Sequence, residues 1–179
     1  MKKIVIMLVV FIIGIFIYKN MHEIYFSKNQ NEKQIEGLQR GDKLKKFKIY
    51  SYPDEKELTN EDFKGKITIL NFGTTWCPYC LEEKKEEEIF LLENSNLVTK
   101  INLVSIMMSS KKEIEKYLKK HKFTMKIYQD KNEKVGDDFF IKSTPTTIII
   151  DENGVILERY SGVTNFESIK IYLKELGVE

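Results

Sequence analysis

Cys77 and Cys80 are the only cysteines in the 179-residue chain, and they stand three positions apart in the stretch GTTWCPYCLEE, residues 73–83. This spacing is compatible with a dithiol–disulfide redox couple, half of a metal site, or a small structural disulfide. The apolar stretch 67–72 predicts a buried strand, and the charged segment 79–93 predicts a helix. Cys77 is therefore expected at a helix N-terminus, with Pro78 in the first turn, where proline is tolerated.

That position favours redox chemistry. Unpaired backbone N–H groups and the positive end of the helix dipole stabilise a thiolate at Cys77, and the thiolate is the nucleophilic form. Cys80, one turn later, lies within reach to resolve a mixed disulfide. A structural disulfide explains the pair poorly, because closing so short a loop removes little entropy from the unfolded chain.

A metal site lacks ligands. Zinc needs four protein ligands, or three with an open position. Beyond the Cys-x-x-Cys pair the chain has two histidines, His22 in a polar segment and His121 at the end of a Lys-rich helix. Both are expected to be surface residues, so we expect no metal.

The first 18 residues differ from the rest, because Lys2 and Lys3 precede an uninterrupted apolar run over 4–18. As a helix this run spans about 22 Å, short of the ~30 Å bilayer core, but flanking lysines can snorkel. We expect residues 1–18 to be an uncleaved signal anchor in the cell membrane, since no small-residue cleavage site follows. A cleaved signal peptide and a buried core helix are the alternatives. A polar tether over 19–40 follows, and the export-signal shape places residues 41–179 outside the cytoplasm.

Residues 41–179 alternate strand and helix patterns, which predicts an α/β fold with a mixed sheet. The chain is 42% hydrophobic, enough for a core, and its net charge of +2 excludes the one-sided basic excess of a nucleic-acid binder. Ser110 with Glu113, and Thr164 with Glu167, are predicted helix capping boxes. The predicted strands are 47–52, 67–72, 101–107, 126–128, 146–150 and 155–160, and the predicted helices are 79–93, 110–121, 133–140 and 164–176.

The motif over 72–80, FGTTWCPYC, with DFKGK upstream and LEE downstream, resembles the active site of thioredoxin-like proteins. Over 41–179 the chain is similar to the membrane-anchored ResA/TlpA branch of extracytoplasmic thiol–disulfide oxidoreductases. The resemblance implies a thioredoxin-like fold, a mixed central sheet flanked by helices, with an N-terminal hairpin. It also implies a central insertion between Cys77 and Pro145, and no cofactor besides the cysteines.

The resemblance also implies roles for further residues. Pro145 matches the family's cis-proline, which packs beside the cysteines and leaves the backbone of Thr144 available to an extended client segment. The alternative is a turn proline before a strand. Trp76 is expected either to cover the edge of the active site or simply to pack.

Two polar residues complete the implied site. Asn71 occupies the buried position where cytosolic thioredoxins carry aspartate. Glu83 matches the glutamate of the ResA type, which assists proton transfer or tunes the cysteine pKa values. Because Glu83 stands among other glutamates, an exposed helix face is the alternative.

Two departures from the family pattern stand out. Lys85 replaces a proline that commonly kinks the helix in relatives. The Pro-Tyr dipeptide between the cysteines is also that of glutaredoxins, although no Gly-Gly-x-Asp-like glutathione site follows Pro145.

The expected activity is thiol–disulfide exchange that reduces disulfides in exported proteins such as apocytochrome c. A membrane thiol reductase of the CcdA/DsbD type would be the electron donor. The direction of electron transfer depends on small differences in reduction potential, so an oxidase that installs disulfides remains the alternative. A membrane-tethered scaffold without turnover and a peroxidase of the peroxiredoxin type are further alternatives.

Overall fold

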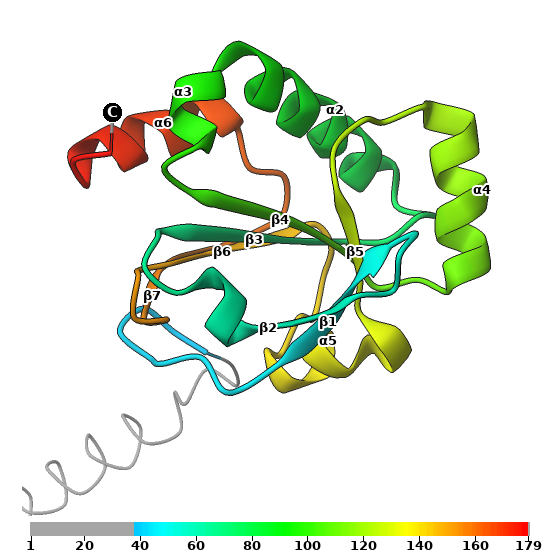
Figure 1. Cartoon of the computed structure of the whole chain (residues 1–179), viewed down its shortest axis with the longest axis horizontal. Coiled ribbons are helices and arrows are strands. Elements are labelled where there is room, and N and C mark those ends of the chain that lie inside the picture. Colours follow the sequence, from blue (N-terminus) through cyan, green and yellow to red (C-terminus); the bar gives the residue numbers. More distant parts are fainter. Residues whose placement is uncertain (1–37, 179) are drawn as a thin grey trace, which may run out of the picture. The chain divides into compact units, whose positions relative to one another are not determined.

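A seven-stranded mixed sheet forms the centre of the domain in the computed structural model, which describes residues 38–178 (Figure 1). The strands follow the order β2-β1-β5-β4-β3-β6-β7 across the sheet. Their bounds are β1 Lys48–Tyr52, β2 Glu57–Thr59, β3 Thr68–Gly73, β4 Asn102–Met107, β5 Ile127–Gln129, β6 Thr146–Ile150 and β7 Ile156–Ser161. The predicted mixed sheet and N-terminal hairpin are confirmed, because β1 pairs antiparallel with β2 whereas β3 and β4 are parallel.

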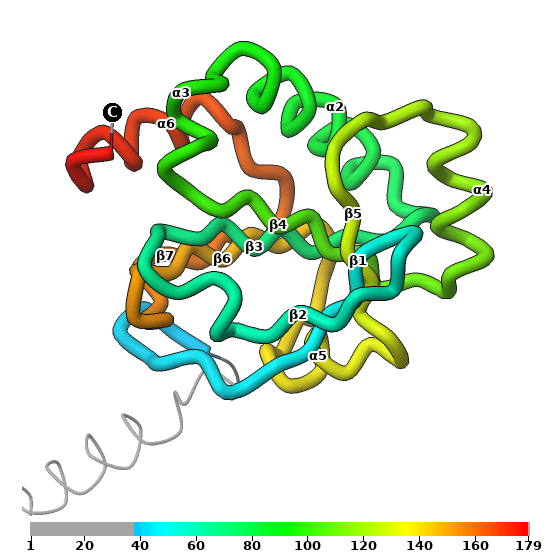
Figure 2. The backbone as a smooth tube through the Cα atoms, viewed as in Figure 1, coloured from blue at the N-terminus to red at the C-terminus, as the bar shows by residue number. Residues whose placement is uncertain are grey.

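Helices cover both faces of this sheet. The bounds are η1 Asn60–Phe63, α2 Pro78–Glu93, α3 Ser95–Val98, α4 Lys111–His121, η2 Lys131–Glu133, α5 Lys134–Asp138 and α6 Phe166–Glu175. Helices α2, α3 and α6 lie together on one side, and η1 and α5 lie on the other (Figure 1). Figure 2 follows the chain from β4 through α4 and β5 before it reaches α5 and β6, which is the extra helix and strand expected between the cysteines and Pro145.

The predicted signal anchor at 1–18 and the tether up to residue 37 lie outside the described residues. Two residues at the end of the predicted tether contact the domain: Leu38 packs against the core, and Arg40 pairs with Glu158 at 2.8 Å. Within 38–178, no helix combines the length and apolarity needed to cross a membrane.

The alternation of side chains along β3 determines which residues point to each face of the sheet. Leu70 and Phe72 point into an apolar cluster with Phe47 and Phe139, whereas Ile69 joins a second cluster under α2 and α6. Successive side chains of a strand point to opposite faces. Asn71 therefore shares the face of Ile69 and lies beneath α2.

The sheet register extends this polar position across three strands. Asn71 is paired with Ser105 of parallel β4 on one side and with Thr147 of antiparallel β6 on the other. All three side chains are buried. A polar row thus crosses the middle of the sheet under α2.

Helix capping differs at one of the two predicted sites. The capping box of Ser110 and Glu113 at the start of α4 is confirmed. The prediction of Thr164 as the cap of the last helix is wrong: Asn165 Oδ1 accepts from the amides of Glu167 and Ser168 at 2.8 and 3.2 Å. The backbone N–H of Thr164 instead donates to Glu83 Oε1.

Candidate active site

Cys77 occupies the N-cap of α2, directly after β3 and a short turn. The backbone N–H of Cys80 donates to Cys77 Sγ at 3.2 Å, so one free amide of the first helical turn points at this sulfur. Both cysteines are free thiols. An N–H directed at sulfur at the positive end of a helix favours the negatively charged, nucleophilic form.

The loop before β6 completes the other side of the sulfur. The Thr144–Pro145 peptide is cis, as expected, and the Cys77 thiol lies 3.5 Å from the carbonyl oxygen of Thr144. The N–H of Gly162 donates to the Pro145 carbonyl at 2.8 Å, which ties the loop after β7 to this loop. Cys77, Thr144 and Pro145 therefore form one site, although they are far apart in the sequence.

Cys80 is the more deeply placed thiol. It is 1% exposed, and burial, followed by its hydrogen bond with Cys77, raises the pKa of Cys80 to about 11. Gly73 lies against it, since a side-chain carbon at Gly73 would come within 3.4 Å of Cys80 Cβ. Cys80 thus stays protonated at neutral pH and needs a base before it can attack a disulfide.

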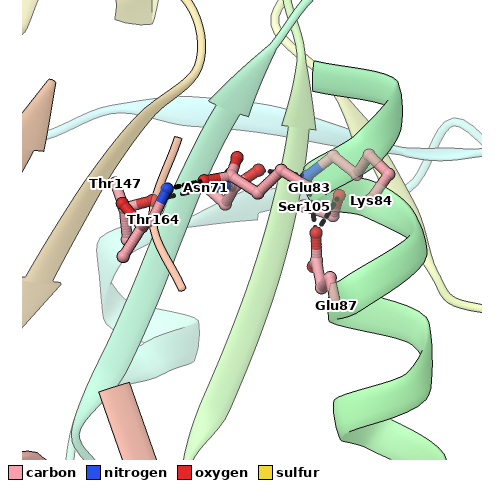
Figure 3. A network of polar contacts seen from close by, with 7 residues as sticks. All are labelled: Asn71, Glu83, Lys84, Glu87, Ser105, Thr147 and Thr164. Carbon is pink, nitrogen blue, oxygen red and sulfur yellow. Dashed lines mark hydrogen bonds and ion pairs between the residues drawn. The ribbon is translucent and has the colours of Figure 1, made fainter. Parts of the chain in front are cut away.

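Glu83 lies one turn beyond Cys80 on the same face of α2 and is fully buried, so the alternative of an exposed helix face is wrong. Its carboxylate accepts from Asn71 Nδ2 at 2.7 Å and from the amide of Thr164 at 2.8 Å (Figure 3). Burial is the largest influence on this carboxyl and raises the pKa of Glu83, although both hydrogen bonds oppose the rise. Glu83 is thereby suited to hold a proton closer to neutrality than an ordinary glutamate does.

Two further charged side chains complete the network in Figure 3, and the motif comparison did not reveal them. Lys84 and Glu87 are each 1% exposed, and Lys84 Nζ lies 2.7 Å from Glu87 Oε2. Lys84 also donates to Asn71 Oδ1, and Ser105 Oγ donates to Glu87 at 3.3 Å. An ion pair therefore lies buried between α2 and the sheet.

A sequence signal for this pair exists. Cys80, Glu83, Lys84, Glu87 and Phe90 are the buried residues of α2, at the i, i+3, i+4, i+7 and i+10 spacing of one helix face. The helix period counted from Cys80 predicts that Lys84 and Glu87 share the buried face of the cysteine. A prediction from hydrophobicity alone would leave both charged side chains exposed to solvent.

Trp76 borders the site on the solvent side. Its side chain is 74% exposed, so it does not pack into the core, and it lines a hollow of about 600 Å³ that also includes Ser109 and Gln129. Tyr79, the residue between the cysteines, is 64% exposed. Among residues 38–178, no three His, Cys, Asp or Glu side chains gather as metal ligands would.

The chain is similar to known proteins of one family. Residues 39–174 match the Redoxin family. Thioredoxin-like protein YneN of Bacillus subtilis (strain 168) is 30% identical over 145 residues, which cover 80% of this chain and 80% of YneN. Thiol-disulfide oxidoreductase ResA of Oceanobacillus iheyensis is 27% identical over 124 residues, which cover 69% of this chain and 64% of that protein.

A solved structure shares the fold. The pneumococcal exposed lipoprotein thioredoxin Etrx1 of Streptococcus pneumoniae strain TIGR4 superposes with a TM-score of 0.64 at 21% identity. The match covers 73% of this chain and 99% of that one. The expected thioredoxin-like fold and the resemblance to the ResA type are confirmed.

Proposed function

This chain belongs to the Redoxin family and is a thiol–disulfide oxidoreductase of the ResA type, and on that premise we propose that it reduces disulfides of exported proteins outside the cytoplasm. The observation that carries the proposal is the environment of Cys77 Sγ. The sulfur receives an N–H from Cys80 at the helix start and lies 3.5 Å from Thr144 O, beside the cis-proline. A nucleophilic sulfur thus stands next to backbone that an extended client can pair with.

In the first step, the Cys77 thiolate attacks one sulfur of the client disulfide. A Cys77–client disulfide forms, the client S–S bond breaks, and the released client thiolate takes a proton from solvent. The backbone of the half-buried Thr144 pairs with the client as an added strand, and the exposed Trp76 contacts the client from the solvent side.

In the second step, Glu83 accepts the proton of the Cys80 thiol, and the Cys80 sulfur then attacks Cys77 Sγ. The Cys77–Cys80 disulfide forms and the second client thiolate leaves, so two electrons have passed from the enzyme dithiol to the client. The raised pKa of Glu83 supports this role, because it lessens the gap in acidity to a thiol with a pKa of about 11.

The N-terminal sequence supports a proposal for the cellular setting of the reaction. We propose that residues 1–18 anchor the chain in the cell membrane, that residues 19–40 act as the tether, and that the catalytic domain faces away from the cytoplasm. A membrane thiol reductase of the CcdA/DsbD type then restores the dithiol, and apocytochrome c is a client of the expected kind.

Reduction of insulin disulfides by the purified domain tests the activity. We expect turnover by the natural sequence and none by Cys77→Ser, whereas equal rates in the two proteins would indicate a scaffold without catalysis. In cells, Cys80→Ala is expected to accumulate mixed disulfides, whose captured partners identify the clients.

The direction of transfer needs its own measurement. A reductase is expected to have a potential nearer to that of thioredoxin, about −270 mV, than to that of the oxidant DsbA, about −120 mV. A value near the latter would overturn the reductive direction and favour the oxidase.

A further inference from the structure

A buried ammonium group lies beneath the redox helix, and the exchange steps above make no use of it. Lys84 Nζ contacts Glu87 Oε2 and Asn71 Oδ1 and is shielded from solvent. A buried ion pair is rarely more stabilising than apolar residues of the same volume, because both charges lose their hydration. Its presence here is better explained by its effect on a neighbouring group.

Asn71 connects Lys84 to Glu83. Since Lys84 donates to Asn71 Oδ1, the amide must turn its Nδ2 group away from the ammonium. The two N–H bonds of Nδ2 are then donated to Glu83 Oε2 at 2.7 Å and to Thr147 Oγ1 at 2.9 Å. With the amide turned over, its oxygen would face the Glu83 carboxylate and its N–H groups would face an ammonium that cannot accept.

The charges around Glu83 do not balance when it is ionised. Two buried carboxylates, Glu83 and Glu87, share the single ammonium of Lys84, and a proton on Glu83 makes the group neutral. The other groups that face this site are uncharged at neutral pH or supply only donors: the Cys80 thiol on α2, the Tyr117 phenol on α4, Asn71, Ser105 and Thr147 on the sheet, and the amide of Thr164.

We propose that Lys84 and Glu87 are positioning residues that set how tightly Glu83 holds the proton of the exchange reaction. Lys84 favours ionised Glu83 through its charge and through the orientation that it gives to Asn71. Glu87 holds Lys84 in place and offsets part of its charge. The inference rests on the role proposed above for Glu83 as the base for Cys80.

Titration of the Glu83 carboxyl by carbon-13 NMR in the reduced protein tests the inference, with the signal assigned through Glu83→Gln. Lys84→Met removes a positive neighbour, so the pKa of Glu83 is expected to rise by about one pH unit or more. Glu87→Gln removes a negative neighbour, so the pKa is expected to fall. The double variant Lys84→Met/Glu87→Gln is expected between the two single variants.

Matched controls lie on the exposed side of the same helix. Lys85→Met and Glu86→Gln make the same changes of charge in water, where screening is strong, and are expected to leave the Glu83 titration near its natural position. Unchanged titration in Glu87→Gln, or shifts of the same sign in both buried single variants, would overturn the proposal. If Lys84→Met does not fold, Glu87→Gln alone decides, because it keeps a polar neighbour for Lys84.

The titration does not depend on turnover, so the two proposals fail separately. Opposite shifts in a protein that does not reduce insulin would overturn the proposed function and leave the positioning role in place. For active variants, the acid limb of the kcat/KM profile is expected to move with the Glu83 pKa, upward in Lys84→Met and downward in Glu87→Gln.

Discussion

The two faces of the central sheet are built by the same strands, and each carries an apolar cluster, but they differ at the middle of β3. Toward η1 and α5, strand β3 presents Leu70 and Phe72 to an apolar cluster. Toward α2 and α6, the same strand presents Ile69 to a second apolar cluster and Asn71 to a buried network that includes the Lys84–Glu87 ion pair. Alternation of side chains along one strand separates the two environments.

The apolar clusters and the polar network have different roles, the first in stability and the second in the reaction. Burial of apolar area is the main source of folding free energy, whereas a buried charge is costly unless it is paired and hydrogen-bonded. In the polar network each carboxylate and the ammonium has hydrogen-bond or ion-pair partners, and these offset part of the free energy lost when the charges leave water. We infer that the apolar clusters on both faces maintain the fold, while the polar network under α2 controls protons near Cys80.

The largest effect is expected in the apolar cluster that contains Phe72. Phe72→Ala removes a fully buried ring that packs edge-on against Phe139, and should lower the free energy of unfolding by about 3–5 kcal/mol. Urea denaturation measures the loss, and Phe72→Leu is expected to lose less. The folded fraction of either variant should reduce insulin at the natural rate. A selective loss of activity without loss of stability would contradict this division of roles.

In the polar network under α2, we expect a substitution to affect activity more than the free energy of unfolding. Glu83→Gln removes the base for Cys80, so resolution of the mixed disulfide should slow by about 10²-fold, as for other general bases. Stopped-flow measurement of client release follows this step. The free energy of unfolding should change less than in Phe72→Ala, because the variant also removes a buried charge. The exposed Glu86→Gln serves as the control, and an equal slowing there would contradict the assignment.

The pH dependence of stability sharpens the comparison further. The folded pKa of Glu83 is raised above its unfolded value, so between those values the folded state binds more protons and stability falls as pH rises. Its contribution is fully present below the unfolded pKa, near 4.5, and is lost through the folded one. The slope is at most about 1.4 kcal/mol per pH unit. Urea denaturation from pH 4 upward should show Glu83→Gln gaining on the natural protein as pH rises; parallel curves would refute the account.

The smallest effect is expected at Trp76, on the exposed border of the active site. Trp76→Ala removes an exposed ring and should change the free energy of unfolding by under about 0.5 kcal/mol. If the ring contacts clients, KM for a protein disulfide should rise roughly fivefold, the loss typical of one interface residue, while KM for a small disulfide should not. Leu92 is 71% exposed elsewhere on α2, so Leu92→Ala should change neither the free energy of unfolding nor KM for the protein disulfide.

Local patterns in the sequence predicted most of the elements. The strand before the cysteines, the redox helix and the capping box at Ser110 depend on neighbouring residues, and all three are present. The cap at Thr164 was predicted wrongly for a non-local reason. Its backbone N–H is bound by Glu83, 81 positions away, and Asn165 caps the helix instead.

The sequence by itself predicted the redox pair, because a Cys-x-x-Cys at a strand-to-helix turn is a local pattern with a specific chemistry. The cis-proline at 145 was predicted from the family resemblance. The helix period counted from Cys80 puts Lys84 and Glu87 on the same face of α2 as the cysteine, but only the tertiary structure decided what covers that face. Their burial depends on β3, β4 and β6 lying side by side, which places Asn71, Ser105 and Thr147 under one face of α2. A charged residue on a helix is compatible with water or with a buried partner, and the partner here comes from another strand.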